Sequence, residues 1–152
     1  MSFAEPTINA EQIEKELYWL LNKIRGVKSI LEIGSREGGS LAFMSNVAVP
    51  GAKLCAIDIG DGDGLMSASS LAETMMGLKN DGFDTHLLIC SSHEPAAMAW
   101  ATAHAPFDFV FIDGDHTYEA VSRDWLGYGP LGKLVGFHDI ATPDLGSARL
   151  WA

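Results

Sequence analysis

The sequence has few cysteines, few cations and no long apolar run, and each shortage excludes a class of protein. Its 152 residues include two cysteines, Cys55 and Cys90, both inside apolar stretches, so we expect core side chains in a reducing compartment, not a disulfide framework. Lysine and arginine number 10 against 20 acidic residues, and the formal net charge of −10 argues against nucleic-acid binding. No apolar run approaches the roughly 18 residues of a membrane helix. Without a basic flank and apolar stretch at the N-terminus, no signal peptide is predicted and we expect a cytoplasmic protein.

Several motifs of known chemistry are also missing. The chain has no G-x-S-x-G nucleophile turn, no Walker A loop, no zinc-type C-x-x-C pair and no Cys/His nucleophile pairing. What is present is typical of a folded domain, since 47% of the residues are hydrophobic and 16 glycines are spread along the chain. We expect a single domain over residues 1–152.

Short apolar segments alternate with helical segments along the whole chain. The expected strands are residues 28–33, 53–59, 85–90, 107–112 and 133–138. The expected helices are residues 9–25, 40–47, 67–79, 94–104 and 118–126. Strands that are apolar throughout, separated by helices, predict a parallel sheet covered on both faces, which is a doubly wound α/β fold. The fifth strand is the weakest prediction because it contains Gly136.

A glycine-rich turn follows the first expected strand. It runs E-I-G-S-R-E-G-G-S from Glu32 to Ser40, and its glycines would let a ligand approach the backbone near free helix N–H groups. A tight strand-to-helix turn without a ligand explains the same residues, and both interpretations stay open. The spacing G-x-x-x-G differs from the G-x-G-x-x-G of dinucleotide-binding folds, which disfavours an NAD oxidoreductase.

Asp58 ends the second expected strand, 24 residues after Gly34. An acidic residue at this point can accept hydrogen bonds from a ribose diol, although a capping or turn aspartate is the simpler alternative. The G-D-G-D-G loop that follows lacks the ligand spacing of a calcium loop.

Two further groups of ionisable residues end the fourth and fifth expected strands. They are Asp113-Gly114-Asp115-His116 and His138-Asp139. If these strands are neighbours, Asp113, His138 and Asp139 would lie together and could bind a divalent cation such as Mg²⁺ or Zn²⁺. Each group alone is better explained by helix capping and local hydrogen bonds, but their joint placement favours a shared site.

Other polar residues have simpler explanations. Ser91 and Ser92 follow the third expected strand, where they could reach a bound base or form a local turn, two interpretations of equal weight. His86, His93 and His104 are scattered on amphipathic segments, so we expect surface or core histidines there.

Four segments together resemble class I S-adenosylmethionine-dependent methyltransferases. They are ILEIGSREGGS, CAIDIG, FDFVFIDGDHTYEAVSRD and VGFHDI, in this order. The resemblance is greatest to the small-molecule O-methyltransferases that include the macrolide-sugar O-methyltransferases and the cephalosporin-hydroxylase-like proteins.

The resemblance implies a role for each matched residue. Glu32, Gly34, Ser35 and Gly38 would line the methionine end of S-adenosylmethionine, Asp58 would hold the ribose, and Ser91 and Ser92 would contact the adenine. Asp113 would lie at the cofactor and reaction centre, His116 would be the general base, and Asp113, His138 and Asp139 would hold any metal. A metal and a base act on the same hydroxyl, because the metal lowers its pKa and the base takes its proton.

The resemblance also implies a longer chain. Family members continue past the fifth strand with a helix and two strands, whereas only residues 140–152 follow it here, so we expect a sheet that lacks its C-terminal strands. The predicted function is O-methylation of a small hydroxylated acceptor, such as a sugar. The alternative is a cofactor-binding module without turnover. We expect Leu145, Leu150 and Trp151 to have little of their own chain to pack against. We also expect the fifth strand, without a neighbour on one side, to make the chain a homo-oligomer.

Overall fold

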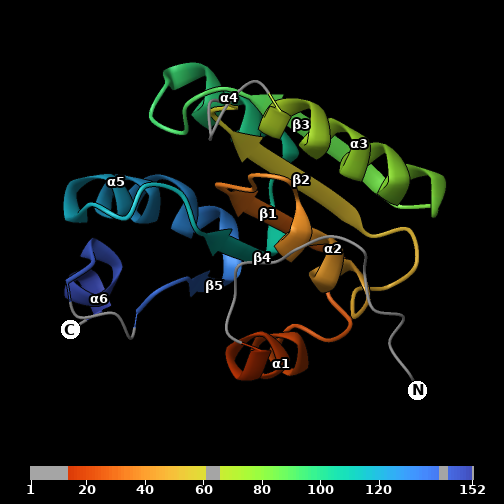
Figure 1. Cartoon of the computed structure of the whole chain (residues 1–152), viewed down its shortest axis with the longest axis horizontal. Helices are drawn as coiled ribbons and strands as arrows, with labels where there is room; N and C mark the ends of the chain where they lie inside the picture. Colours follow the sequence, from red (N-terminus) through yellow and green to blue (C-terminus); the bar gives the residue numbers. More distant parts are fainter. Residues whose placement is uncertain (1–13, 61–65, 141–143, 152) are drawn as a thin grey trace.

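The protein folds around one parallel sheet of five strands, with helices on both faces (Figure 1). The structure is a computed structural model that describes residues 14–60, 66–140 and 144–151. The strands are β1 (Ser29–Ile33), β2 (Lys53–Asp58), β3 (Asp84–Ile89), β4 (Phe107–Ile112) and β5 (Gly132–Phe137). Their order across the sheet is β3-β2-β1-β4-β5, and all neighbouring pairs are parallel. The predicted doubly wound fold is therefore confirmed.

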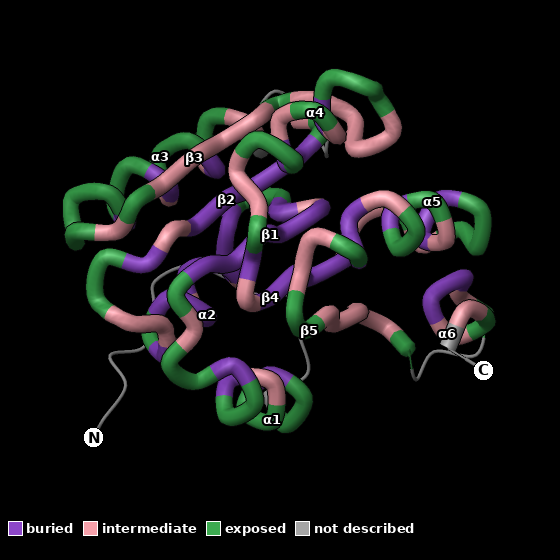
Figure 2. The backbone as a smooth tube through the Cα atoms, turned by 180° about the vertical axis from the view of Figure 1, so that it is seen from behind, coloured by how far each residue is buried: buried purple, intermediate pink, exposed green. Residues whose placement is uncertain are grey.

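Six α-helices and one 3₁₀ helix are described around the sheet. They are α1 (Glu14–Lys23), α2 (Gly39–Ser45), α3 (Met66–Asn80), α4 (Pro95–His104), α5 (Tyr118–Tyr128), η1 (Gly129–Leu131) and α6 (Gly146–Trp151). Buried side chains of α1, α2 and α3 pack on one face of the sheet, and those of α4 and α5 pack on the other. The buried strands lie between these layers (Figure 2). None of the described helices is both long and apolar enough to cross a membrane.

Alternation along each central strand divides the core between the two faces. In β1, Ile30 packs with the α1–α3 side, whereas Leu31 and Ile33 pack with the α4–α5 side. This division explains why β1, β2 and β4 are almost uniformly apolar and could be predicted within one residue of their ends. Both cysteines are unpaired, with Cys55 buried in the core and Cys90 half-buried.

Gly136 has a packing reason in β5. A Cβ at this position would lie 2.8 Å from the ring of Phe109 on β4. The glycine therefore makes room for an aromatic side chain of the neighbouring strand. Strand β5 is formed although Gly136 made it the weakest prediction. The reason for the glycine is the Phe109 ring on β4, which the local sequence of β5 does not reveal.

The segment after β5 differs from expectation. Helix α6 packs on α5, and the backbone N–H of Gly146 donates to His116 O at 2.7 Å. Leu150 packs against the core cluster on the α4–α5 side. The expectation that Leu150 would have little of its own chain to contact is therefore wrong, because α6 folds back on α5. The side chain of Trp151 and the expected helix start at Asn9 lie outside the described residues.

The strand register brings the C-terminal ends of the strands to one edge of the sheet. The backbone N–H groups of Gly34, Asp113 and His138 donate to the neighbouring strands' Ile57 O, Ile33 O and Ile112 O, at 2.9, 2.8 and 3.2 Å. From β1 the chain adds β2 and then β3 on one side, and it then returns to add β4 and β5 on the other side of β1. In such sheets the crevice beside this reversal is where ligands bind.

Candidate functional site

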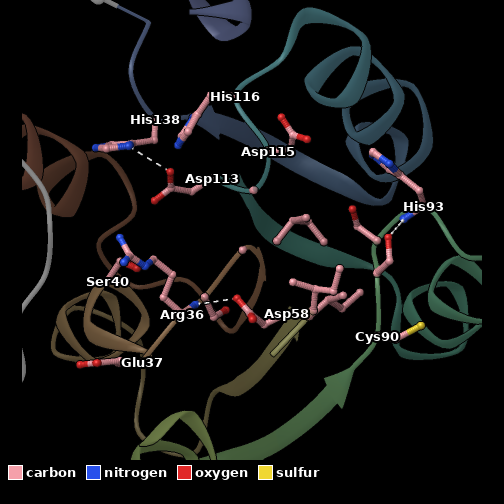
Figure 3. Close-up of a pocket in the computed structure, with 18 of the residues that line it drawn as sticks. Arg36, Glu37, Ser40, Asp58, Cys90, His93, Asp113, Asp115, His116 and His138 are labelled. Carbon is pink, nitrogen blue, oxygen red and sulfur yellow. Dashed lines mark hydrogen bonds and ion pairs between the residues drawn. The ribbon is translucent and has the colours of Figure 1, made fainter. Parts of the chain in front are cut away.

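A cavity of about 680 Å³ opens at this edge of the sheet (Figure 3). Its volume lies within the range of small-molecule sites. The lining includes most of the predicted site residues, which are Gly34, Ser35, Asp58, Ser91, Ser92, Asp113, His116, His138 and Asp139. Glu32 and Gly38 do not line it. The topology has thus gathered residues from all five strand ends around one space.

Gly34 and Gly38, two of the three glycines of the turn after β1, are required by packing. A Cβ on Gly34 would lie 2.2 Å from the backbone O of Asp113, and one on Gly38 would lie 2.8 Å from Thr74 of α3. Both residues also have positive φ angles, of 83° and 85°. Both glycines are therefore required by the turn itself, whether or not a ligand binds there. Gly34 also lines the cavity, whereas Gly38 contacts α3 instead of the cavity that the resemblance implied.

Glu32 lies below the cavity as a fully buried carboxyl group. Its Oε1 accepts a hydrogen bond from Ser40 Oγ, and the Ser35 side chain lies beside the same carboxyl group. Burial raises the pKa of Glu32 to about 8, against the opposing effect of the Ser40 hydrogen bond. Ser35 is in the cavity wall, so its side chain lies between the buried Glu32 carboxyl group and the site.

Asp58 has both carboxylate oxygens engaged by backbone. Its Oδ2 accepts from the N–H of Arg36 and its Oδ1 accepts from the N–H of Gly60, both at 2.7 Å. Each oxygen has a second lone pair available to a ligand. The turn role and the ribose role considered for Asp58 are therefore compatible. The hydrogen bonds of the turn hold the carboxylate in place at the cavity.

The structure brings together the ionisable side chains at the ends of β4 and β5. His138 Nδ1 lies 2.9 Å from Asp113 Oδ1 and 3.1 Å from Asp139 Oδ2, and His116 Nδ1 lies 3.9 Å from the same Asp139 oxygen. Asp139 has a left-handed φ of 57°, a conformation that aspartate tolerates better than most residues. The expected convergence of Asp113, His138 and Asp139 is therefore observed. Figure 3 shows His116 near Asp113 and His138.

The imidazole of His138 itself lies between the two carboxylates. The Asp113 carboxylate raises the pKa of His138, while burial raises the pKa of Asp113 against the influence of the imidazole. Across the described part of the chain, no three His, Cys, Asp or Glu side chains are arranged to hold a metal ion. Two carboxylates and an imidazole are chemically suitable ligands for a divalent cation. However, His138 Nδ1 itself occupies the space between the carboxylates of Asp113 and Asp139.

The cavity carries a surplus of acidic groups. The carboxyl groups among its described lining residues are those of Glu37, Asp58, Asp113, Asp115 and Asp139. Arg36 is the one arginine or lysine among the described lining residues. A site with this balance favours a ligand that carries positive charge and disfavours the phosphates of a dinucleotide.

His93 is a cavity residue that sequence reasoning placed at the surface or in the core. It lines the cavity and its Nε2 lies 3.3 Å from Asp124 Oδ1, on α5. His86 and His104 are not part of the lining, as expected for them. The sequence feature that could have indicated a site at His93 is Asp124. It is an acidic residue on the buried side of α5, together with Ala120, Val121 and Tyr128.

The two serines before His93 also lie at the cavity. Ser91 Oγ accepts from the backbone N–H of His93 at 3.3 Å, which is the local turn considered for it. Ser92 Oγ donates to Asp124 Oδ1 at 2.8 Å. Both serines line the cavity, so the turn does not exclude a role at a ligand.

Comparison with known proteins gives a family. Residues 31–140 match a family model described as a methyltransferase domain. No curated protein matches the sequence. This match covers more than half of the chain, and the chain therefore belongs to this family of methyltransferase domains.

Solved structures show the same fold. The O-methyltransferase from Bacillus cereus in complex with SAH is similar over 84% of this chain, with 19% identity and a TM-score of 0.56. The O-methyltransferase TomG from Streptomyces achromogenes, involved in tomaymycin synthesis and solved with SAM, is similar over 90% of this chain, with 20% identity and a TM-score of 0.57. This chain covers 55% of the length of the first and 65% of the second.

Proposed function

We propose that this member of the methyltransferase-domain family transfers a methyl group from S-adenosylmethionine to a hydroxyl group of a small molecule. The acceptor implied by the sequence resemblance is a hydroxylated compound such as a sugar. The structural neighbours with bound SAM or SAH carry the name O-methyltransferase, which supports the same reaction class.

The observation that carries the proposal is the acidic cavity at the edge of β1, β2 and β4. S-adenosylmethionine has a positively charged sulfonium and no phosphate. Five carboxyl groups against one guanidinium therefore complement this cofactor and oppose a dinucleotide. The same charge balance agrees with the glycine spacing, which differs from that of NAD-binding folds.

We assign the cofactor-binding roles by position. Asp58, fixed by two backbone N–H groups, would accept hydrogen bonds from the ribose hydroxyls. Gly34 and Ser35, which both line the cavity, would lie along the methionine part. Glu32 does not line the cavity but accepts a hydrogen bond from Ser40, which does, and Gly38 packs against α3. Ser91 and Ser92 lie beyond Asp58, on the side of the base.

The cofactor supplies a methyl group on a cationic sulfur, which an acceptor oxygen can attack in line. His116 is the proposed general base. Its ring is more exposed than that of His138, and it lies 3.9 Å from the Asp139 carboxylate, whereas His138 lies 2.9 Å from the Asp113 carboxylate. Asp139 Oδ2, 3.9 Å from His116 Nδ1, would stabilise the imidazolium that forms when the hydroxyl proton is taken. Asp113 lies at the same reaction centre.

A divalent cation at Asp113, His138 and Asp139 is a further part of the proposal. Two carboxylates and an imidazole suit Mn²⁺, Fe²⁺ or Zn²⁺, and the carboxylates suit Mg²⁺. A cation would have to displace the contacts of His138 Nδ1 with the two carboxylates. No step of the proposed reaction depends on this cation.

A cofactor-binding module without turnover is the alternative function. The chain covers 55% and 65% of the length of the two solved neighbours. The two functions share the cofactor site and differ in the acceptor reaction.

One experiment addresses both functions. Calorimetric titration with S-adenosylmethionine, S-adenosylhomocysteine and NAD should give binding of the first two and none of NAD. Incubation with S-adenosylmethionine and a panel of hydroxylated small molecules should then release S-adenosylhomocysteine with one class of acceptor. Cofactor binding without release on any acceptor would favour the binding module, and preference for NAD would contradict both.

A further inference from the structure

Asp124 is a buried carboxyl group on α5 that the proposed reaction does not use. The residue is 1% exposed, and burial raises its pKa against the opposing hydrogen bond from Ser92. Its Oδ1 accepts from Ser92 Oγ at 2.8 Å and lies 3.3 Å from His93 Nε2. Burial of a carboxyl group is unfavourable unless its partners are well placed. Both of these partners line the cavity, which links Asp124 to the site.

Two more contacts from α5 hold the same loop. The hydroxyl of Tyr128 donates to Ser92 O at 2.5 Å, and Arg123 Nη2 donates to His93 O at 3.5 Å. The loop between β3 and α4 is thus tied to α5 through its backbone as well as its side chains. Such contacts restrict the positions that His93 can adopt.

The surroundings of His93 select the ring nitrogen that carries its proton. Nε2 faces two acceptors, Asp124 Oδ1 at 3.3 Å and the backbone O of Ala120 at 3.4 Å. A proton on Nε2 satisfies both, and in the neutral ring this leaves Nδ1 as a hydrogen-bond acceptor. The His93 side chain remains 25% exposed, and the residue is part of the cavity lining.

The position of His93 relative to Asp58 indicates which part of the cofactor Nδ1 of His93 would contact. Asp58 pairs with Ile89 across β2 and β3, and the backbone N–H of Cys90 donates to Asp58 O at 2.8 Å. The residues that follow Cys90 therefore lie next to the proposed ribose position. In Figure 3, His93 and Cys90 lie on the opposite side of the cavity from His138. The group that extends from the ribose away from the reaction centre is the purine base.

We propose that Asp124 is a positioning residue that holds His93 with Nδ1 as an acceptor for the 6-amino group of the cofactor's adenine. His93 is then a specificity-determining residue for a 6-aminopurine over a 6-oxopurine. This inference rests on the proposed function, because it requires an adenosyl cofactor in the cavity. It gives roles to two residues, His93 and Asp124, to which the resemblance assigned none.

The chemistry of the two purines makes the proposal measurable. The 6-amino group is a donor, whereas the 6-oxo group of hypoxanthine is an acceptor that would face the acceptor Nδ1. An unpaired acceptor in a partly desolvated site lowers affinity by about tenfold to a hundredfold. S-adenosylhomocysteine and S-inosylhomocysteine differ at this position and in the proton on N1 of the inosine form.

The test is calorimetric titration of the full chain with these two compounds. The wild type should prefer S-adenosylhomocysteine by about tenfold or more. The His93→Ala variant should lose this preference, chiefly through weaker binding of S-adenosylhomocysteine. The Asp124→Asn variant should also lose it, because the amide can present its NH₂ to Nε2 and reverse the tautomer.

Two controls separate positioning from support of the fold. Tyr128→Phe removes the hydrogen bond to Ser92 O and should weaken both compounds equally, without changing their ratio. His86→Ala changes a histidine that pairs with Asp84 and is not part of the cavity lining, and it should change neither affinity. Thermal unfolding of each variant checks that it is folded.

The outcomes are distinct. An unchanged ratio in folded His93→Ala, or equal losses for both compounds in Asp124→Asn, would overturn the inference and leave the proposed function standing. Failure of the wild type to bind S-adenosylhomocysteine would overturn the proposed function and the inference with it.

Discussion

The backbone N–H of Arg36 donates to Asp58 Oδ2 at 2.7 Å, which joins the turn after β1 to the end of β2. The two residues are 22 positions apart in the sequence and come from neighbouring strand ends. Arg36 has a left-handed φ of 48°, and this hydrogen bond helps to hold that conformation. Asp58 thus orders the glycine turn and faces the proposed ribose position at the same time.

Replacement of Asp58 by alanine should weaken cofactor binding. The variant loses the acceptors for the ribose hydroxyls, and hydrogen bonds to a charged group contribute about 1.5–3 kcal/mol. Calorimetry with S-adenosylhomocysteine measures the change. Asp81→Ala, in the exposed turn after α3, is the matched control and should bind like the wild type. Equal affinities for Asp58→Ala and the wild type would contradict the ribose role.

Glu32 should make stability depend on pH. Its folded pKa of about 8 lies above the ordinary value of 4.5, so the folded state binds a proton more tightly than the unfolded state. Its contribution is fully present below pH 4.5 and is lost as pH rises through 8. A pKa that differs by one between the folded and unfolded states corresponds to about 1.4 kcal/mol, so the loss is on the order of a few kcal/mol.

Glu32→Gln removes this titration. Urea unfolding should show that the variant gains stability relative to the wild type between pH 5 and pH 9, with the greatest gain at the alkaline end. Glu73→Gln, at an exposed position of α3, should give a difference that does not change with pH. A constant difference for Glu32→Gln would show that its carboxyl group is ionised throughout.

His116→Ala should slow turnover without weakening the cofactor. A general base typically contributes about 10²–10⁴-fold to the rate. The measurement is release of S-adenosylhomocysteine with an acceptor found in the panel, together with calorimetry. His86→Ala controls for loss of a histidine outside the cavity lining. If turnover of His116→Ala equals that of the wild type, the base is another group.

Asp113, His138 and Asp139 should take up a divalent cation. Titration calorimetry with Mg²⁺, Mn²⁺ and Zn²⁺ should show binding that Asp139→Asn weakens at least tenfold, because a carboxylate is a stronger ligand than an amide for these ions. Asp81→Asn removes an exposed carboxylate elsewhere and should leave binding unchanged. No uptake of any of the three ions by the wild type would exclude the metal site.

The chain should self-associate through β5. In the described part of the chain this strand pairs with β4 alone, and Leu134 on it is 43% exposed. An edge with unpaired backbone groups beside apolar side chains favours pairing with a second copy. Sedimentation over a tenfold concentration range should show a dimer that Leu134→Lys dissociates. A wild type that stays monomeric throughout would refute this prediction.

The local pattern of the sequence determined the strands. Ile30 and Leu31, like Phe109 and Val110, are adjacent apolar residues that point to opposite faces, and only a strand covered on both sides tolerates such a run. The alternation with helices then predicted a parallel sheet with all strand ends at one edge. Asp58, Asp113 and His138 could be placed at the site because each follows a recognisable strand.

Only the tertiary structure decided which of these groups act together and what supports them. The contact of Asp113 with His138 requires β4 and β5 to be neighbours, and the pairing of His93 with Asp124 requires α4 and α5 to cover the same face. Glu32 is part of an apolar strand, but its hydrogen bond from Ser40 Oγ depends on how the turn after β1 folds back toward it. These relationships join residues far apart in the chain, and their energies depend on burial, which local sequence patterns do not contain.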